Sequence, residues 1–455
     1  MCIRDRPRFR ENERQTEKLD LEFPKEGSIP IIQILNTLQE KTNFLDAFRH
    51  YSMKNNPKKP DKDLFFSGIL AYGCNIGLRP MAIKVGTITA NSLENTVNWY
   101  FSLENVRRAN DIVIGMLDKL KIGELFKKDP SVVHTSSDGQ KFYVQVNSVH
   151  SNYGWKYFGK EKGIVALSFI DDMHRLFHSL TISSTEREAL YVLEGLMQNE
   201  VVQSDMHSTD THGTNAVNFG LLYLSKIKFI PRIEDFQSHN FYAFEDTFIP
   251  HLNDYNLKCE KTINTSIIEN NWDEICQFMT TIFSRHCSAS TLLKRLSSYT
   301  QQHPVFQALK EFNKIIKTLN MLEYLDSEEL RKLIPGQLNK GENSNKFARA
   351  VSYENGGEIK FASKEEQLLS DACRRLIQNI IIAWNYLYLS DLVFKASPEE
   401  REKIIKAIKE SSPVHWMHVN LSGSFDFSTA ALKDSLEFDI EKLFNFDWKE
   451  AKLEF

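Results

Sequence analysis

Long apolar runs, paired cysteines and an excess of one charge are all missing from this 455-residue sequence. No apolar run approaches the roughly 18 residues of a membrane span. The longest candidate, residues 376–389, is interrupted by Gln378, Asn379 and Asn385. The six cysteines form no CxxC pair, which excludes a zinc ribbon and a thioredoxin-type site and favours reduced thiols. With 56 basic and 60 acidic side chains, the net charge of −4 also argues against a polybasic nucleic-acid binder.

The signatures of several enzyme classes are missing as well. The sequence has no Walker-type phosphate loop, no GxSxG elbow and no HExxH motif. Its first residues contain no apolar segment and mix Asp5, Glu11 and Glu13 with arginines, which disfavours a signal or transit peptide. We therefore expect a cytoplasmic protein, and we interpret residues 1–28 as an irregular or arbitrary start.

The residues that are present describe a folded chain with large cores. Hydrophobic residues make up 42% of the sequence, 31 of them Phe, and the length suits about three domains. From Ser422 to the end there are eight acids and only four lysines, so residues 422–455 are interpreted as an acidic tail. The preceding residues are balanced in charge.

The pattern of apolar residues divides the chain into helical and strand-rich parts. Helical spacing predicts a helical domain at 29–130, a helical insertion at 262–335, and closing helices at 336–421. Between them, residues 131–261 form the first part of a core. Its predicted strands are 131–146, 163–172, 176–184, 201–210 and 228–236, with helices at 186–200 and 213–227. Three strands, helix, strand, helix, strand is the order of a ribonuclease-H-like α/β fold, with a mixed sheet covered by helices on both faces.

Two aspartates are placed by this strand order. Asp138 lies within the first strand, beside Gly139, and Asp210 ends the fourth. Because the first and fourth strands are neighbours in such a sheet, their carboxylates could converge. Each has a simpler interpretation: an Asp-Gly turn at Asp138, and an N-cap at Asp210 for a helix starting near Gly213.

Glu342 is the third candidate, in the first turn of a helix expected beside the sheet. Its simpler interpretation is a capping box with Asn339. Three further glutamates, ranked lower, are Glu358, Glu365 and Glu366. His207 and His212 are five residues apart and share no helical face, which favours local hydrogen bonding over a histidine metal site.

Two Asp and one Glu supply the hard oxygen ligands that Mg²⁺ prefers. Two such ions roughly 3.5 to 4 Å apart activate a water or a 3′-hydroxyl on one side of a phosphodiester and stabilise the leaving oxygen on the other. Such a site needs no nucleophilic side chain.

At these residues the chain resembles the replicative transposases of the Tn3 family, whose core is a ribonuclease-H-like DDE domain. The resemblance extends from about Ile29 to about Phe427 and rests on ordered motifs. Those motifs are SSDGQKF, NYGWKYFGKEKG, REALYVLEGLMQNE, TDTHGTNAVNFGLLYL, FIPRIEDF, NNWDEICQF, SASTLLKRLSSY, GQLNKGENSNKFARAV, NGGEI, IIAWNYLYL and WMHVNLSGSF. The text THGTN after the second Asp is looser than is usual in the family.

The resemblance implies that Asp138, Asp210 and Glu342 are the catalytic acids and hold two Mg²⁺ ions, which Mn²⁺ can replace. It implies nicking of transposon 3′ ends and strand transfer to target DNA, giving a cointegrate. It further implies inverted-repeat and target DNA as partners, a homodimer, and nucleoid association when DNA is bound. Family members are longer, so we interpret the chain as the carboxyl-terminal half of a transposase. The alternative is a non-catalytic remnant that binds DNA or dimerises.

Basic residues beside these motifs are candidate phosphate contacts, although each also suits a solvated helix face or strand edge. They are Arg107, Arg108, Arg232, Lys294, Arg295, Lys340, Lys346 and Arg349. Three aromatic residues, Tyr153, Trp155 and Tyr157, could stack on a displaced base, but ordinary core or surface packing is the simpler interpretation.

Overall fold

The computed structural model describes residues 23–52, 58–146, 148, 151–255, 257–298, 303–423, 425–432, 436–446 and 448. Most of the predicted irregular start, residues 1–22, lies outside these ranges. So do parts of the predicted acidic tail, namely 424, 433–435, 447 and 449–455.

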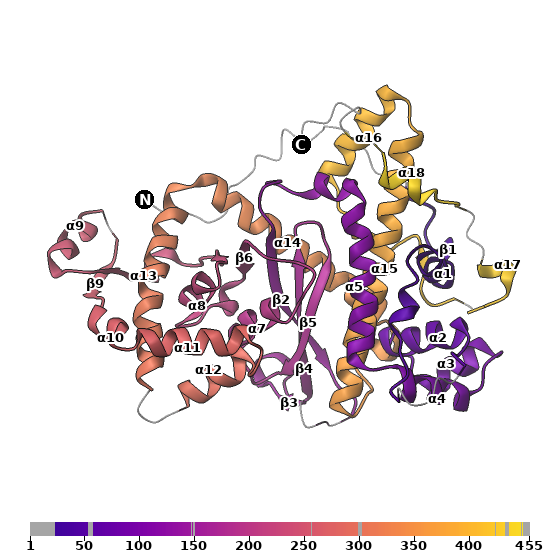
Figure 1. Ribbon diagram of the computed structural model, residues 1–455, viewed down its shortest axis with the longest axis horizontal. Helices are drawn as coiled ribbons and strands as arrows, with labels where there is room; N and C mark the ends of the chain where they lie inside the picture. The colour runs from indigo at the N-terminus through magenta and orange to yellow at the C-terminus, as the bar shows by residue number, and fades with distance from the viewer. Residues whose placement is uncertain are drawn as a thin grey trace.

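A curled mixed sheet stands in the middle of the molecule (Figure 1). Its strands follow the order β3-β4-β2-β6-β7, with β5 beside β4. The pairs β2–β4, β3–β4 and β4–β5 are antiparallel, whereas β2–β6 and β6–β7 are parallel. The strand bounds are β2 His134–Tyr143, β3 Asn152–Tyr153, β4 Lys162–Asp171, β5 Leu176–Ser183, β6 Met206–Thr209 and β7 Lys228–Phe229. The predicted mixed pairing and the adjacency of the first and fourth strands are confirmed.

Strand β4 shows why helices cover both faces of this sheet. Ile164 and Ala166 belong to the core that contains α5 and α15, while Val165, Leu167 and Phe169 belong to the core of α7, α8 and α13. Side chains alternate between the two faces of a strand, so the apolar run 164–167 within β4 is buried on both sides. The helices named here are α5 Leu103–Lys119, α7 Val192–Met197, α8 Asn218–Leu224, α13 Pro304–Asp326 and α15 Lys364–Lys395.

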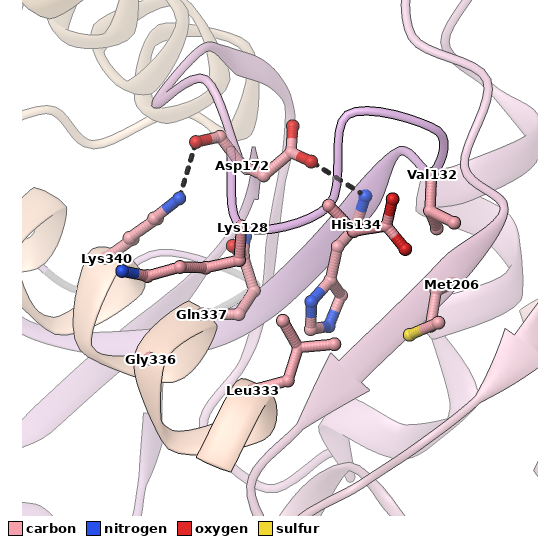
Figure 2. Close-up of a pocket in the computed structure, with 10 residues that line it drawn as sticks. Lys128, Val132, His134, Asp172, Met206, Leu333, Gly336, Gln337 and Lys340 are labelled. Atoms are coloured by element: carbon pink, nitrogen blue, oxygen red, sulfur yellow. Dashed lines mark hydrogen bonds between the residues drawn. The ribbon is translucent and has the colours of Figure 1, made fainter. Parts of the chain in front are cut away.

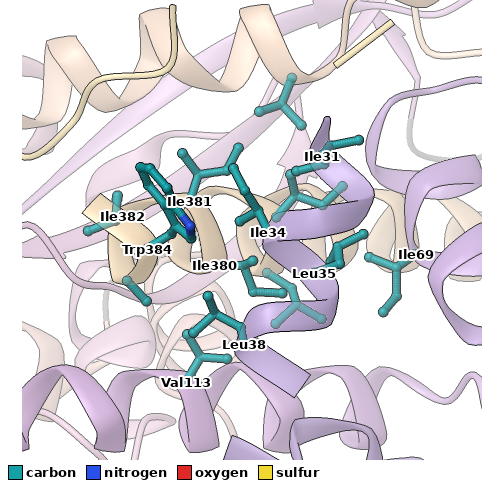
Figure 3. Packing of buried hydrophobic residues seen from close by; sticks show 14 of the residues in the cluster. Ile31, Ile34, Leu35, Leu38, Ile69, Val113, Ile380, Ile381, Ile382 and Trp384 are labelled. Atoms are coloured by element: carbon teal, nitrogen blue, oxygen red, sulfur yellow. The ribbon is translucent and has the colours of Figure 1, made fainter. Parts of the chain in front are cut away.

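Helix α15 is the central support of the larger core. Figure 3 shows Ile34, Leu35 and Leu38 of helix α1 facing Ile380 and Ile381 of α15. In Figure 1, α5 and α15 run side by side between the sheet and the remaining amino-terminal helices. Those helices are α1 Ile31–Thr42, α2 Lys62–Gly73, α3 Leu78–Val85 and α4 Ala90–Tyr100.

The side-chain nitrogens of polar residues that interrupt the apolar run of α15 donate hydrogen bonds inside the protein, whereas the buried Asn385 Oδ1 has no partner among the described residues. The Asn379 amide donates to Asn110 Oδ1 at 2.7 Å, and the Asn385 amide donates to the carbonyls of Pro413 and His415 at 2.8 and 2.7 Å. Buried amides need such partners. None of the helices in the described part of the chain combines the length and the apolar character that crossing a membrane requires.

Helix α14, Glu328–Val351, crosses one predicted boundary. It begins after the N-cap Ser327 and continues through Pro335, so the expected division at 335/336 falls inside a helix. The helices before it pack, through α13, against α8.

The remaining elements are β1 Ile29–Pro30, α6 Trp155–Phe158, β8 Phe241–Ala243, α9 Ile249–Asp254, β9 Cys259–Thr262, α10 Thr265–Asn270, α11 Trp272–Phe283, α12 Ala289–Ser297, α16 Pro398–Glu410, β10 Val419–Asn420, α17 Thr429–Leu432 and α18 Ile440–Phe444.

Candidate active site

Asp138 lies where two parallel strands separate. Strand β2 pairs with β6 only as far as Ser137 opposite Thr209, while β2 itself continues and pairs Asp138 with Ser168 of β4. The interpretation of Asp138 as part of an Asp-Gly turn is therefore wrong, because the strand runs on through Gly139. Asp138 is the first residue of β2 beyond the end of β6. From this residue onward, β2 no longer pairs with β6.

Two hydrogen bonds fix the carboxylate of Asp138. The Gly139 amide donates to Oδ1 at 2.9 Å, and the Asn345 side-chain amide of α14 donates to Oδ2 at 2.7 Å. A carboxylate has about four lone-pair positions, so each oxygen keeps one for a further partner.

Asp210 follows directly on the last residue of β6 and lies across the same opening. Its Oδ1 accepts the Gly213 amide at 3.1 Å, closing the short 3₁₀ turn Thr211–Gly213. The carboxylate thus has a capping role, but for this turn, because helix α8 starts only at Asn218. Its charge still acts on Asp138, whose pKa it raises.

Glu342 approaches from helix α14 and is exposed. The preceding Gly341 lies close to the strand, because a Cβ there would be in van der Waals contact, 3.8 Å from the Asp138 Cβ and 3.9 Å from the Ser136 Oγ. The expected first-turn position and the capping box with Asn339 are wrong, because α14 already begins at Glu328.

The electrostatics of Asp138 tie the three acids together. Burial raises the pKa of Asp138, and the charges of Asp210 and Glu342 raise it further, against the lowering effects of the Gly139 amide and Lys141. A cation would relieve this accumulation of negative charge, and carboxylate oxygens are the donors that Mg²⁺ takes. Within the described residues, no three His, Cys, Asp or Glu side chains are close enough to form a ready metal cage. The carboxylate oxygens are thus the right kind of ligand for Mg²⁺, but the carboxylates lie further apart than in a closed metal site.

Glu188 is a fourth carboxylate at this opening, and sequence reasoning missed it. Its side chain occupies the space in front of Gly139, where any Cβ would overlap its carboxyl group. Burial, followed by the charge of Asp138, raises the pKa of Glu188 to about 7. In the sequence, an acid at position 188 is already explained by its place in the first turn of the predicted helix 186–200, where the helix dipole favours negative charge. The only sequence signal that another side chain approaches Asp138 closely was the glycine at position 139.

The candidate phosphate contacts on α14 and in the segment after β7 lie nearest the acids. The Arg232 amide donates to the Thr209 carbonyl at 2.8 Å, which places exposed Arg232 beside Asp210. Lys346 and Arg349 are exposed on α14, further along the helix from Glu342.

Two of the other basic candidates, Arg108 and Lys294, form ion pairs with glutamates. Arg108 pairs with Glu104 at 2.6 Å on α5, which packs on β5 and α15, and neighbouring Arg107 is half-buried. Lys294 of α12 pairs with Glu186 and donates to the Tyr191 hydroxyl at 2.5 Å, while Arg295 next to it is exposed.

Lys340 does not face a free surface. Its ammonium donates to the carbonyls of Phe126, at 3.2 Å, and Asp172, and burial lowers the pKa of Lys340 to about 8. Figure 2 shows it beside a small cavity of about 50 Å³, with Asp172 and His134. This cavity lies where β2 and β6 begin, at the opposite end of these strands from Asp138 and Asp210.

The candidate histidines and aromatic residues differ in burial and in hydrogen bonding. His207 is fully buried between Thr135 Oγ1 at 2.8 Å and Ser137 Oγ at 3.0 Å, which confirms local hydrogen bonding, while the His212 side chain is outside the described set. Tyr153 and Trp155 are 62% and 76% exposed, so neither is a core residue. The side chain of the third aromatic candidate, Tyr157, is also not described.

Comparison with known proteins bears directly on this arrangement. Residues 33–425 match the model of the Tn3 transposase DDE domain. The chain belongs to the Tn3 transposase family. The matched range of this family member includes Asp138, Glu188, Asp210 and Glu342.

Three Tn3-family relatives show the extent of the similarity. The chain is 29% identical over 405 residues to the transposase for transposon Tn1546 of Enterococcus faecium. It is 30% identical over 403 residues to that for transposon Tn2501 and 28% identical over 404 residues to that for transposon gamma-delta, both of Escherichia coli. In each case the match covers 88% of this chain and 40% of the relative.

Proposed function

We propose that this chain is the catalytic part of a replicative DNA transposase, which nicks the 3′ ends of a transposon and joins them to target DNA. The observation that carries the proposal is that two further carboxylates, Asp210 directly after β6 and Glu342 on α14, raise the pKa of Asp138 in β2. The strand order β5-β4-β2-β6-β7, with its antiparallel and parallel halves, supports a ribonuclease-H-like core.

The acids are proposed to hold metal while neighbouring groups orient them. Asp138, Asp210 and Glu342 would hold two Mg²⁺ or Mn²⁺ ions, which supply Lewis-acid activation of a water or 3′-hydroxyl and stabilise the leaving oxygen. Asn345 and the Gly139 amide hold the Asp138 carboxylate in one orientation. Arg232, Lys346 and Arg349 offer cations to the DNA phosphates nearby.

The proposed partners are transposon-end inverted repeats, target DNA and a second copy of the chain, with nucleoid association when DNA is bound. Since the chain spans about 40% of the length of the curated relatives it matches, recognition of the ends is proposed to need more than this part. The test therefore uses pre-nicked or branched DNA that carries the element's ends.

Asp138→Asn tests the proposal directly. The variant keeps the size of the side chain and removes its charge, so we expect Mg²⁺- or Mn²⁺-dependent cleavage and strand transfer to fall by at least about 100-fold, as for loss of one preorganised electrostatic group. The products are resolved on denaturing gels. Equal activity of the wild type and Asp138→Asn under both metals would show that the proposed chemistry is wrong.

Glutamate variants supply a matched comparison. Glu342→Gln is expected to lose activity, whereas Glu365→Gln, in the first turn of α15, is expected to retain it. A protein that binds DNA or pairs with a longer transposase, and shows no turnover in any of these forms, would instead be the non-catalytic remnant.

A further inference from the structure

A groove of about 410 Å³ opens beside the candidate active site. It lies between the end of β2, the last turn of α14 and the 3₁₀ turn Glu354–Gly357. Strand β2 also carries Asp138, and α14 also carries Glu342. In a helix, seven residues are two turns, so Arg349 in the groove lies on the same side of α14 as Glu342 and about 10 Å further along.

The groove has the charge of an anion site. Lys141 and Arg349 line it, and none of the described residues on its wall carries a carboxylate. Lys141 also lowers the pKa of both Asp138 and Glu188, so its charge reaches the acids as well as the groove. A negatively charged ligand is therefore favoured in the groove, directly next to a place where negative charge is concentrated.

Two hydroxyl groups in the groove wall have no hydrogen-bond partner among the described residues. They are the Oγ of Ser352, a residue only 1% exposed, and the phenolic oxygen of Tyr353. Both oxygens are themselves buried behind the groove wall, and a buried polar group without a partner costs free energy. The two cations that line the groove suit a phosphate group.

The shape of the groove suits more than a phosphate. Tyr143 lines it, and although its ring packs against that of Phe158, the residue is 40% exposed and can contact a base. On the opposite side, Gly356 and Gly357 have positive φ angles of 62° and 82° and no neighbouring atom where a Cβ would project. The volume falls within the roughly 300–1,000 Å³ of small-ligand sites and can take a nucleotide.

We propose that this groove binds one unpaired nucleotide of the DNA strand whose reacting phosphodiester lies at the acids. The proposal rests on the proposed function. Lys141 and Arg349 hold the phosphate, and Tyr143 contacts the base. The offset of about 10 Å corresponds to roughly three steps of 3.4 Å along a strand.

The test measures binding of a fluorescein-labelled, twelve-residue oligothymidylate by fluorescence anisotropy, in a chelator so that metal chemistry plays no part. We expect Lys141→Ala/Arg349→Ala to weaken binding at least about tenfold and to reduce the salt slope by about 0.7, the value for one phosphate contact to a single strand. Lys406→Ala, an exposed lysine of α16, is the matched control and should change neither. Thermal unfolding of each variant verifies that it is folded, and Arg349→Ala alone tests the groove if the double variant does not fold.

Two results would overturn the proposal. One is equal binding by the wild type and the folded Lys141→Ala/Arg349→Ala protein, or by folded Arg349→Ala if the double variant does not fold. The other is competition by inorganic phosphate that matches the oligonucleotide at equal phosphate concentration, which would mean a simple anion pocket. Asp138→Asn separates the two proposals: it should lose cleavage, while its oligonucleotide binding should still fall at least about tenfold when Lys141 and Arg349 are also replaced by alanine. If the wild type has no cleavage activity but the groove variants still lose binding, the catalytic proposal fails and the groove stands.

Discussion

Gly139 and Glu188 compete for one small space beside Asp138, and this makes the glycine a sensitive position. In Gly139→Ala the new methyl group would overlap the Glu188 carboxyl, which must then move. If Glu188 helps to hold the proposed ions, Mn²⁺ affinity should fall about 10- to 100-fold, the usual effect of disturbing groups that support metal ligands. Calorimetric titration with Mn²⁺ measures this without any DNA.

Gly115→Ala is the control for that substitution. Gly115 lies in α5, where a Cβ meets nothing within 4 Å, so Mn²⁺ binding should stay at the wild-type value. If Gly139→Ala binds Mn²⁺ as tightly as the wild type, Glu188 does not contribute to metal binding.

At the scale of residues, the sequence predicted which residues form the site better than it predicted where their side chains point. Asp138 and Asp210 could be chosen because the strand order brings their strands together. Lys340, two residues from Glu342, was expected at phosphate, but its side chain turns to the carbonyls of Phe126 and Asp172 instead. No sequence pattern states which way a long, flexible side chain turns, because that depends on acceptors that folding brings from distant segments.

Helix α7 depends on a glycine for its contact with the sheet. A Cβ at Gly195 would overlap the ring of buried Phe169 on β4. Gly195→Ala should therefore lower the free energy of unfolding by about 1–3 kcal/mol, the usual cost of overpacking. Urea unfolding, with m-values compared, measures the change.

The same substitution at Gly336 in α14 should have the opposite sign. Nothing lies within 4 Å of a Cβ there, so alanine is expected to stabilise the helix by about 0.5–1 kcal/mol. Equal effects at Gly195 and Gly336 would show that helix propensity, and not contact with Phe169, decides both.

At the scale of elements, strands were easier to predict than the start of α14. Apolar runs such as 163–172 mark strands that are buried on both faces, and β4 lies there. Pro335 usually ends or kinks a helix, so a boundary near it was reasonable. The helix continues because its packing on β2 and α15 outweighs the local preference, and packing is not visible in local sequence.

For the molecule as a whole, buried acids and buried histidines act in opposite directions on stability. Burial raises the pKa of Asp111 and of Asp172 to about 6, and lowers the pKa of His134 and of His207 to about 3. Below their usual pKa of about 6.5, the histidines bind protons only in the unfolded chain, so they destabilise the fold as the pH falls. The acids bind protons first in the folded chain and stabilise it over the same range. The two groups therefore partly offset each other in the total.

A single substitution separates these opposing contributions. His207→Asn should unfold more easily than the wild type at pH 8, because it disturbs the hydrogen bonds to Thr135 and Ser137. Below pH 6.5 the wild type loses up to about 1.4 kcal/mol per pH unit through His207 and the variant does not, so the difference should narrow by about 2–3 kcal/mol by pH 4.5. Urea unfolding at pH 8, 6.5, 5.5 and 4.5 measures it, with the exposed His286→Asn expected to follow the wild type. A difference between His207→Asn and wild type that stays constant with pH would mean that His207 takes up its proton inside the folded sheet.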